Sequence, residues 1–515
     1  MSQSKKATKT VIILLVFSII SKLLGFIRES LIAAKFGSGS ETDALFIALT
    51  TTTLFTVFIT NAISTTMIPV LSEIEFNEGK PAKRKHASKL VNIIIVVSGA
   101  IVIVSWIFAP LIVKVMASGF KGEQFQLAVK LTRIGLPVIF FANLVGVFRG
   151  YLQDESMFIE SAVADFPLNL TYIAYLIFFT SIFGIDGLMV ASVIAAGTQL
   201  LVQIPGIKKT KFKYSFALDF KDKYVRKIII LSTPVLISVA INDINKIVDR
   251  SLASTLIPGS ISSLNYASRL NLLILEVFVK SITTVIFPIL SKGASKENYS
   301  GLKTTMKHSI NVIIMIIIPA TVGITVLAER IVVVAFQRGV FDTVATQMTT
   351  GALIFYSLGL IGTAIRLLLN KVYYSLQDTK TPMINGLISI GLNIVLNLIL
   401  IRFMQHNGLA LATSIAGIIS TGYLMFGLNK RIGKIEYRNV LNCFVKSLIA
   451  SLIMGIIVYT VNGFLISSSG FINQVIQLLG LVVIGGLTYF VAISLMRVDE
   501  ISWFMRQIKK RKKKN

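Results

Sequence analysis

The chain has 515 residues, of which 54% are hydrophobic and only 15% are charged, and its formal net charge is +27. Soluble domains carry about 25% charged residues, so this composition excludes an ordinary globular protein. The single cysteine, Cys443, excludes a disulfide scaffold and a cysteine-based metal cluster, and three histidines argue against a His-rich metal site.

Apolar runs of about 20 residues recur from Val11 to Met496, and this is the length that a helix needs to cross a bilayer. The first run follows three lysines, as in a signal peptide, but no small-residue cleavage site follows it, so we interpret it as a retained helix. The sequence therefore predicts an all-α polytopic membrane protein with about 14 transmembrane helices. We expect these helices near residues 10–33, 43–71, 90–116, 124–151, 157–182, 186–206, 228–255, 262–290, 308–328, 345–375, 382–401, 408–428, 440–464 and 472–496.

The positive charge is distributed unevenly over the loops between these helices. Most Lys and Arg residues of the loops fall on the side that holds both termini, including the loop 208–227 and the basic tail 506–515. Positive charge marks the cytoplasmic side, so we expect a multi-pass protein of the plasma membrane with both termini in the cytoplasm. Because the basic residues flank spans, we expect them to contact anionic membrane lipids and not nucleic acid.

Four short sequences recur in the same order after about 220 residues. For example, Leu152-Gln153-Asp154 returns as Leu376-Gln377-Asp378. This repeat predicts two six-helix lobes, 1–207 and 228–430, of the same orientation. We expect a basic cytoplasmic linker at 208–227, and two extra helices with a basic cytoplasmic tail at 431–515. Transporters with parallel repeats bind substrate between their lobes, although a duplicated bundle without transport activity is the alternative.

Three cations within the predicted spans indicate a binding site for an anion. Lys22 and Arg28 lie on the first helix, and Arg269 lies on the eighth. A cation within the bilayer costs at least a few kcal/mol unless it has a partner, a wet cavity or a ligand. Few acids lie nearby in the sequence, apart from Glu29 and Asp43, and the planar fork of arginine suits phosphate. The alternative is that these side chains reach toward lipid headgroups.

A second group of polar residues could bind a monovalent cation. Asp249 lies on the predicted seventh helix, Asn393 and Asn397 share one face of the eleventh, and Thr413 is on the twelfth. Carboxylate, amide and hydroxyl oxygens are ligands for a hard cation, with Na⁺ or H⁺ as the coupling ion. The alternatives are that Asp249 pairs with Lys246 or Arg250, and that the amides form interhelical hydrogen bonds.

The sequence contains no Walker A motif, HExxH motif, nucleophile elbow or Rossmann glycine fingerprint. We therefore expect a secondary transporter without a cofactor, and not an enzyme or an ATP-driven pump.

Three segments, GFIRESLIAAKFGSGSETDALFIA, FPILSK and YYSLQDTKTP, resemble the MurJ/MviN family of lipid II flippases, which belongs to the multidrug/oligosaccharidyl-lipid/polysaccharide exporter superfamily. The resemblance extends from about Ser21 to Leu428. It implies transport of an undecaprenyl-pyrophosphate-linked peptidoglycan precursor from the inner to the outer leaflet of a bacterial membrane by alternating access. It also implies that Arg28 and Arg269 contact the headgroup and that Asp43 lies near the outer mouth. Asp249, Asn393, Asn397 and Thr413 match positions of a cation site in some relatives.

The chain departs from the family pattern at Lys22, where arginine is usual, and at Thr50–Thr53, where an arginine pair is common. Three alternatives therefore stay open. One is a flippase for another polyprenyl-linked saccharide. The second is a cation-coupled multidrug exporter, although this would favour an acidic pocket. The third is a scaffold that recruits other cell-wall synthesis proteins.

Overall fold

The computed structural model describes residues 3–294, 299–433, 435, 437–465 and 470–496. In these ranges the chain forms helices and contains no β-strand, which confirms the predicted all-α class. The basic tail that the sequence analysis assigned to the cytoplasm lies outside the described residues.

The chain divides into two compact units, each of which packs its own helices. Unit 1 comprises residues 1–262 with the short segment 338–341, and unit 2 comprises 263–337 and 342–515. The helices of unit 1 are α1 (Gln3–Phe36), α2 (Ser40–Ile107), α3 (Ala109–Met116), α4 (Gly122–Gly135), α5 (Pro137–Asp154), α6 (Phe158–Val163), α7 (Asp165–Phe178), α8 (Thr180–Lys209) and α9 (Lys223–Ala253). The basic linker predicted at 208–227, which would separate two six-helix lobes, stays a prediction.

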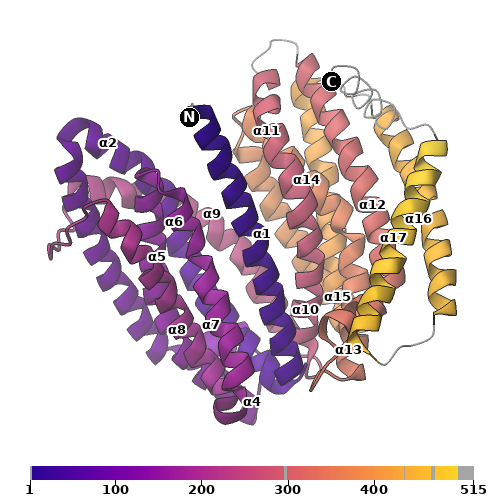
Figure 1. Cartoon of the computed structure of the whole chain (residues 1–515), viewed down its shortest axis with the longest axis horizontal. Coiled ribbons are helices and arrows are strands. Elements are labelled where there is room, and N and C mark those ends of the chain that lie inside the picture. The colour runs from indigo at the N-terminus through magenta and orange to yellow at the C-terminus, as the bar shows by residue number, and fades with distance from the viewer. Residues whose placement is uncertain (1–2, 295–298, 434, 436, 466–469, 497–515) are drawn as a thin grey trace. The chain divides into compact units, whose positions relative to one another are not determined.

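The helix α10 (Ser260–Ile274) begins in the last residues of unit 1 and continues into unit 2. A single π-helical turn at Leu275–Val279 joins it to the next helix. The other helices of unit 2 are α11 (Lys280–Ala294), α12 (Ser300–Phe336), α13 (Thr343–Leu358), α14 (Leu360–Ser375), α15 (Lys380–Ile432), α16 (Arg438–Phe464) and α17 (Phe471–Leu495) (Figure 1).

The helices α2 and α15 are longer than a bilayer requires, and each contains a sharp break that divides it into two arms. In α2 the backbone at Gly79 takes φ 82°, a left-handed value that glycine adopts without steric cost. In α15 the break is at Gln405, with φ 50°. Each break separates two predicted spans, 43–71 from 90–116 in α2 and 382–401 from 408–428 in α15.

Among the described residues, nine helices are long and apolar enough to cross a membrane. The pair α13 and α14, bent by 45° at Gly359, would make a tenth span. The length and composition of the helices therefore confirm a polytopic membrane protein. They do not confirm the predicted count of about 14 spans.

The core of unit 1 lies where α2, α5 and α9 meet. Met67 and Leu71 of α2 pack with Leu144 and Tyr151 of α5 and with Ile228 of α9. All five side chains are buried, and burying each large apolar side chain contributes about 2 kcal/mol. The core also includes α2 residues beyond the break at Gly79, such as Leu90, so it holds both arms of α2.

The segment between α8 and α9 is an extended strap that lies on α2. The amide of Asn92 donates to the carbonyl oxygens of Ser215 (2.9 Å) and Ala217 (3.0 Å). The strap ends at Asp222, whose carboxylate accepts the first free N–H groups of α9 and a bond from Lys89. Burial disfavours the charged form, but the bond from Lys89 and the N–H of Val225 hold the pKa of Asp222 below its ordinary value.

The two C-terminal helices α16 and α17, yellow in Figure 1, pack side by side and against α12. Gly455 of α16 allows α16 to approach α12 closely, because a Cβ atom on Gly455 would lie 2.8 Å from Val322 Cγ1 of α12. Arg330 of α12 extends between α16 and α17 and donates to Gln477 Oε1 (2.8 Å) and the Asn462 carbonyl (3.3 Å). The predicted extra helices are thus an integral part of unit 2.

Candidate functional site

The helix α1 carries two of the predicted anion-binding cations, and it packs against α7. Phe17 meets Phe166 edge to face with the ring centroids 5.2 Å apart. One turn further along, the Asn169 amide donates to the Ser21 carbonyl at 3.4 Å. Gly25 leaves room there, since a Cβ atom on it would lie 3.8 Å from Asn169 Oδ1. This packing fixes the half of α1 that presents Arg28.

The guanidinium of Arg28 is held in place on two sides. Its centre lies 5.0 Å from the centroid of the Tyr172 ring of α7, within the range of a cation–π interaction. One terminal nitrogen donates to Glu29 Oε1 at 3.0 Å. The Arg28 side chain is 18% exposed and the Glu29 side chain is 6% exposed. Both groups are therefore largely withdrawn from solvent.

Glu29 neutralises part of the charge on Arg28 but does not use all of its donors. In the described part of the chain, the buried Nε–H of Arg28 has no hydrogen-bond acceptor. An unsatisfied buried donor costs about 1–3 kcal/mol, and more for a charged group. The guanidinium therefore keeps donor capacity that Glu29 does not use.

Lys22 is half-buried on the same helix. Six residues separate it from Arg28, which corresponds to about 9 Å along the axis and about 120° around it. The two cations therefore lie at different depths on different sides of α1. Both residues lie on α1, as the sequence predicts, and their role in binding stays a prediction.

Arg269 belongs to unit 2, where its side chain is exposed on α10. The first turn of this helix is fixed by Asp43, which the family resemblance places near the outer mouth and among the substrate-binding residues. Asp43 Oδ1 accepts from the backbone N–H and hydroxyl of Ser262, both at 2.7 Å, and Oδ2 accepts from the N–H of Gly259 at 2.8 Å. Asp43 is only 2% exposed, so its carboxylate is committed to this turn.

The predicted cation ligands are divided between the two units. In unit 1, Asp249 Oδ2 accepts from the Asn245 amide at 3.3 Å, one turn earlier on α9. Lys246, which the sequence offered as a partner for Asp249, bonds to Asp243 at 2.8 Å. Arg250, the other predicted partner, donates to the Ile261 carbonyl at 3.0 Å.

In unit 2 the structure brings Asn393, Asn397 and Thr413 together across the break in α15. The Asn397 amide donates to Asn393 Oδ1 at 2.9 Å, and the Asn393 amide donates to the Thr413 hydroxyl at 3.3 Å. Both asparagines are buried. The bond from Asn393 to Thr413 joins the two arms of α15, which is the interhelical role that the sequence analysis kept as an alternative.

The sequence analysis missed a charged cluster at the end of α5. Lys83, although only 1% exposed, bonds to Asp154 (2.9 Å), Glu75 and Glu155. Three carboxylates at this spacing could hold a metal ion, but the Lys83 ammonium already supplies the positive charge. The signal available in the sequence was Asp154 itself, which belongs to the repeated Leu-Gln-Asp.

The repeated acid of unit 2, Asp378, is also bound by a cation. Arg431 of α15 bonds to Asp378 Oδ2, and Thr381 donates to the same carboxylate from its N–H (2.9 Å) and hydroxyl (2.7 Å). Burial opposes ionisation, but the bonds from Thr381 and the charge of Arg431 outweigh it and lower the pKa of Asp378. Each unit therefore fixes the buried acid of its Leu-Gln-Asp turn with a salt bridge, although the cation is buried in unit 1 and 46% exposed in unit 2.

These features define a polytopic helical membrane protein with semi-buried cations and no recognisable catalytic motif. Comparison with known proteins gives its family. The family model for lipid II flippase MurJ matches residues 32–479, and the chain therefore belongs to the MurJ family. This is a family of lipid transporters and not of enzymes.

Individual relatives agree with this assignment over nearly the whole chain. A protein named "Probable lipid II flippase MurJ" from Buchnera aphidicola subsp. Baizongia pistaciae is 29% identical over 90% of this chain and 91% of its own length. The solved structure titled "Lipid II flippase MurJ, inward closed conformation" is 29% identical, has a TM-score of 0.80, and is matched over 95% of this chain and 100% of that one.

A multidrug resistance MATE family transporter of the MOP superfamily, solved in an inward-facing conformation, has the same fold. Its TM-score is 0.69 at 14% identity, over 83% of this chain and 99% of that one. This likeness supports the predicted superfamily fold.

Proposed function

We propose that this protein is a lipid II flippase, which moves the undecaprenyl-pyrophosphate-linked peptidoglycan precursor from the inner to the outer leaflet of the bacterial plasma membrane. The support is the match to the MurJ family over residues 32–479, together with a structural relative of the same activity that covers 95% of the chain. No covalent bond is made or broken in this process.

The geometry of Arg28 is the observation that best supports a diphosphate cargo. Its guanidinium is fixed by Tyr172 and Glu29, and its Nε–H has no acceptor among the described residues. Glu29 uses one terminal nitrogen, so the guanidinium keeps further donors with which it can bind a phosphate. Lys22 and Arg269 are the other two predicted anion-binding cations, and they would add positive charge at the substrate site. The charge of the diphosphate would offset that of cations which otherwise destabilise the bilayer-embedded protein.

The headgroup would cross the membrane through a hydrated path by alternating access, while the polyprenyl tail stays in the lipid. The membrane potential is a sufficient driving force for such a cycle. Moving one charge through 100 mV is worth about 2.3 kcal/mol, which biases an equilibrium roughly fifty-fold. With both termini in the cytoplasm, as the positive loops predict, the anionic headgroup moves toward the positive side.

A monovalent cation, Na⁺ or H⁺, is the second proposed energy source. Asp249 in unit 1 and the set of Asn393, Asn397 and Thr413 in unit 2 are the predicted ligands. Asp249→Asn should make transport in vesicles insensitive to an imposed ion gradient, whereas transport driven by membrane potential alone should persist. An unchanged response to the gradient in this variant and in Asn393→Ala would contradict coupling at these residues.

Complementation tests the proposed cargo. Expression of this chain should restore growth and cell shape to a bacterium depleted of its own lipid II flippase. Arg28→Ala should fail to do so, while Arg28→Lys should restore growth partly because it keeps the charge but loses the fork. Arg402→Ala, which removes an exposed arginine of unit 2, is the matched control and should behave as the unaltered chain.

Failure of the unaltered chain to complement, although it is present in the membrane, would contradict lipid II as the cargo. Transport of a different polyprenyl-linked saccharide by the same preparation would then identify the alternative substrate.

A further inference from the structure

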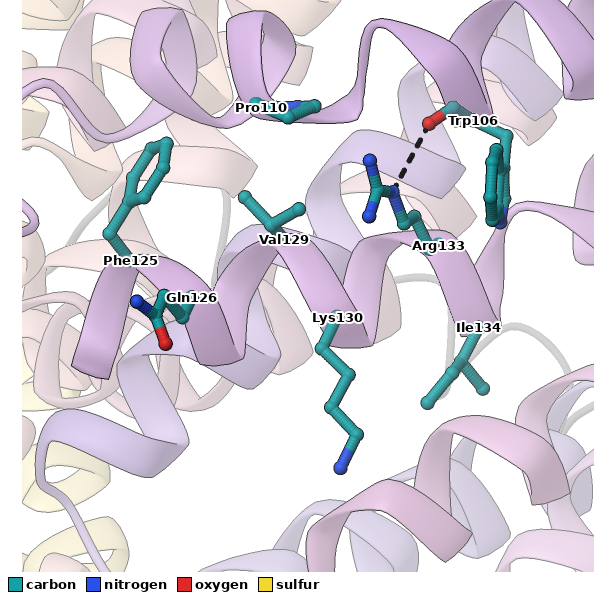
Figure 2. Close-up of a pocket in the computed structure, with 8 residues that line it drawn as sticks. All are labelled: Trp106, Pro110, Phe125, Gln126, Val129, Lys130, Arg133 and Ile134. Carbon is teal, nitrogen blue, oxygen red and sulfur yellow. Dashed lines mark hydrogen bonds between the residues drawn. The ribbon is translucent and has the colours of Figure 1, made fainter. Parts of the chain in front are cut away.

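We propose that the outer surface of unit 1 binds the phosphodiester headgroup of an anionic phospholipid, in a pocket separate from Arg28. The pocket has a volume of about 480 Å³ and lies between the junction of α2 with α3 and one face of α4. Figure 2 shows its lining residues, which are Trp106, Pro110, Phe125, Gln126, Val129, Lys130, Arg133 and Ile134.

Arg133 is the one polar group that is fixed in an orientation suited to an anion. Its Nε donates to the Trp106 carbonyl at 3.2 Å, and its guanidinium centre lies 4.7 Å from the centroid of the Trp106 ring. Figure 2 shows the Arg133 side chain directed toward Trp106, with both terminal nitrogens on the open side of this contact. Within the described residues, no carboxylate lies within salt-bridge distance of Arg133. The two terminal nitrogens are therefore available to a ligand.

The charge of the pocket suits a monoanion. Lys130 also lines the pocket, but its ammonium is paired with Asp186 at 2.6 Å and extends away from Arg133 in Figure 2. This pair contributes no net charge, so the pocket carries about one positive charge from Arg133. A phosphodiester carries one negative charge, whereas a lipid-linked diphosphate carries at least two. Charge complementarity thus favours a phospholipid over the proposed transport substrate.

The surroundings of the pocket suit a ligand with acyl chains. Trp106, Ile107, Phe108 and Leu111 are each more than half exposed along the rim formed by α2 and α3. The pocket walls contributed by Pro110, Val129 and Ile134 are also apolar. A soluble phosphate would gain nothing from these side chains, whereas the acyl chains of a lipid would cover them.

The depth of Arg133 agrees with a headgroup contact. The helices α4 and α5 form a candidate span of 33 residues, which is about 50 Å long and exceeds the hydrocarbon layer by roughly 20 Å. A centred span would extend about 10 Å beyond the hydrocarbon at the α4 end, which places the Cα atom of Arg133 roughly 6 Å inside it. Because helical side chains point toward the N-terminus, the guanidinium reaches back to the headgroup boundary.

Native mass spectrometry of the purified full-length chain tests this proposal directly. Phosphatidylglycerol should bind more tightly than zwitterionic phosphatidylcholine, and Arg133→Gln should weaken the binding of phosphatidylglycerol about tenfold. Arg133→Lys should lose part of the affinity because it lacks the fork. Lys114→Gln removes an exposed cation of the neighbouring α3 outside the pocket and should bind as the unaltered chain does.

Fluorescence gives a readout that does not depend on changing the pocket. The sequence contains two tryptophans, so Trp503→Phe leaves Trp106 as the only one. Phosphatidylglycerol with brominated acyl chains should quench Trp106 at lower concentrations than brominated phosphatidylcholine. Equal quenching by both lipids, or equal phosphatidylglycerol binding by Arg133→Gln, would overturn the proposal. Arg133-dependent binding of undecaprenyl diphosphate without binding of phosphatidylglycerol would also overturn it.

Discussion

The guanidinium centre of Arg28 lies 5.0 Å from the centroid of the Tyr172 ring, across the contact between α1 and α7. A cation over the face of a partly desolvated tyrosine gains about 0.5–2 kcal/mol, and the contact also fixes the plane of the guanidinium. Tyr172 is 7% exposed, so this support is part of the packed unit and not a surface contact. Tyr172 is therefore a positioning residue for Arg28.

Replacement of Tyr172 should separate this role from general packing. Tyr172→Leu removes the ring and should weaken binding of a diphosphate lipid about fivefold. Tyr172→Phe keeps the ring face and should bind nearly as the unaltered protein does. Titration of the purified protein with undecaprenyl diphosphate measures both affinities. The same loss in both variants would show that the hydroxyl group, and not the ring, supports binding.

Lys83 should be the residue of unit 1 whose charge matters most for stability. Lys83→Met leaves Asp154, Glu75 and Glu155 close together without their cation, which costs about 3–5 kcal/mol by analogy with broken buried ion pairs. Thermal unfolding in detergent should show a markedly lower midpoint.

Lys80→Met provides the control for this experiment, because Lys80 is 60% exposed and lies 3.7 Å from Glu75. An exposed pair of this kind contributes about 0–1 kcal/mol, so the midpoint should hardly change. If Lys83→Met and Lys80→Met lowered the unfolding midpoint equally, the claim that the Lys83 charge stabilises unit 1 most would be contradicted.

The salt bridge in unit 2 predicts a dependence of stability on pH. The pKa of Asp378 is lower in the folded protein than its ordinary value of 3.8, so its ionised form stabilises the fold. This contribution is fully present above about pH 5 and is lost as the pH falls below 3.8 through the lowered pKa. Arg431→Gln should lower the unfolding midpoint at pH 7, and its difference from the unaltered chain should narrow below pH 3.8. If the difference in unfolding midpoint stayed constant below pH 3.8, the stabilising role of ionised Asp378 would be contradicted.

Gly119 should be intolerant of any side chain. A Cβ atom there would lie 2.3 Å from the Ser254 carbonyl oxygen, which is backbone and cannot move aside easily. Gly119→Ala should therefore destabilise unit 1 by about 1–3 kcal/mol. Gly99→Ala is the matched control, since a Cβ atom at Gly99 meets nothing within 4 Å and alanine is the better helix former. Unfolding midpoints that fall equally in both variants would contradict this account of Gly119.

Much of the helical architecture could be predicted from the sequence, because spans of this length and apolarity have few alternatives. Lys22 and Arg28 lie on one helix, as predicted, because an apolar run of this length forms a helix through local geometry alone. The helices 440–464 and 472–496 were found for the same reason, and α16 and α17 correspond to them closely.

Contacts between distant segments could not be predicted in this way. The stacking of Tyr172 on Arg28 depends on which helix packs against α1, and periodicity does not carry that information. The burial of Lys83 was missed because a lysine between two predicted spans is normally solvated. Its partner Asp154 lies 71 residues later in the chain. The Trp106–Arg133 pocket depends in the same way on the packing of α4 against the α2–α3 junction.

The most direct test of the proposed function is transport of fluorescent lipid II by the purified protein in vesicles. The unaltered chain should expose lipid II of the inner leaflet to a membrane-impermeant reagent outside, at a rate that rises with membrane potential. Arg28→Ala should slow this exposure at least tenfold, and Arg402→Ala should not slow it. Transport at the normal rate by a correctly folded Arg28→Ala protein would contradict the role of this guanidinium in moving the diphosphate.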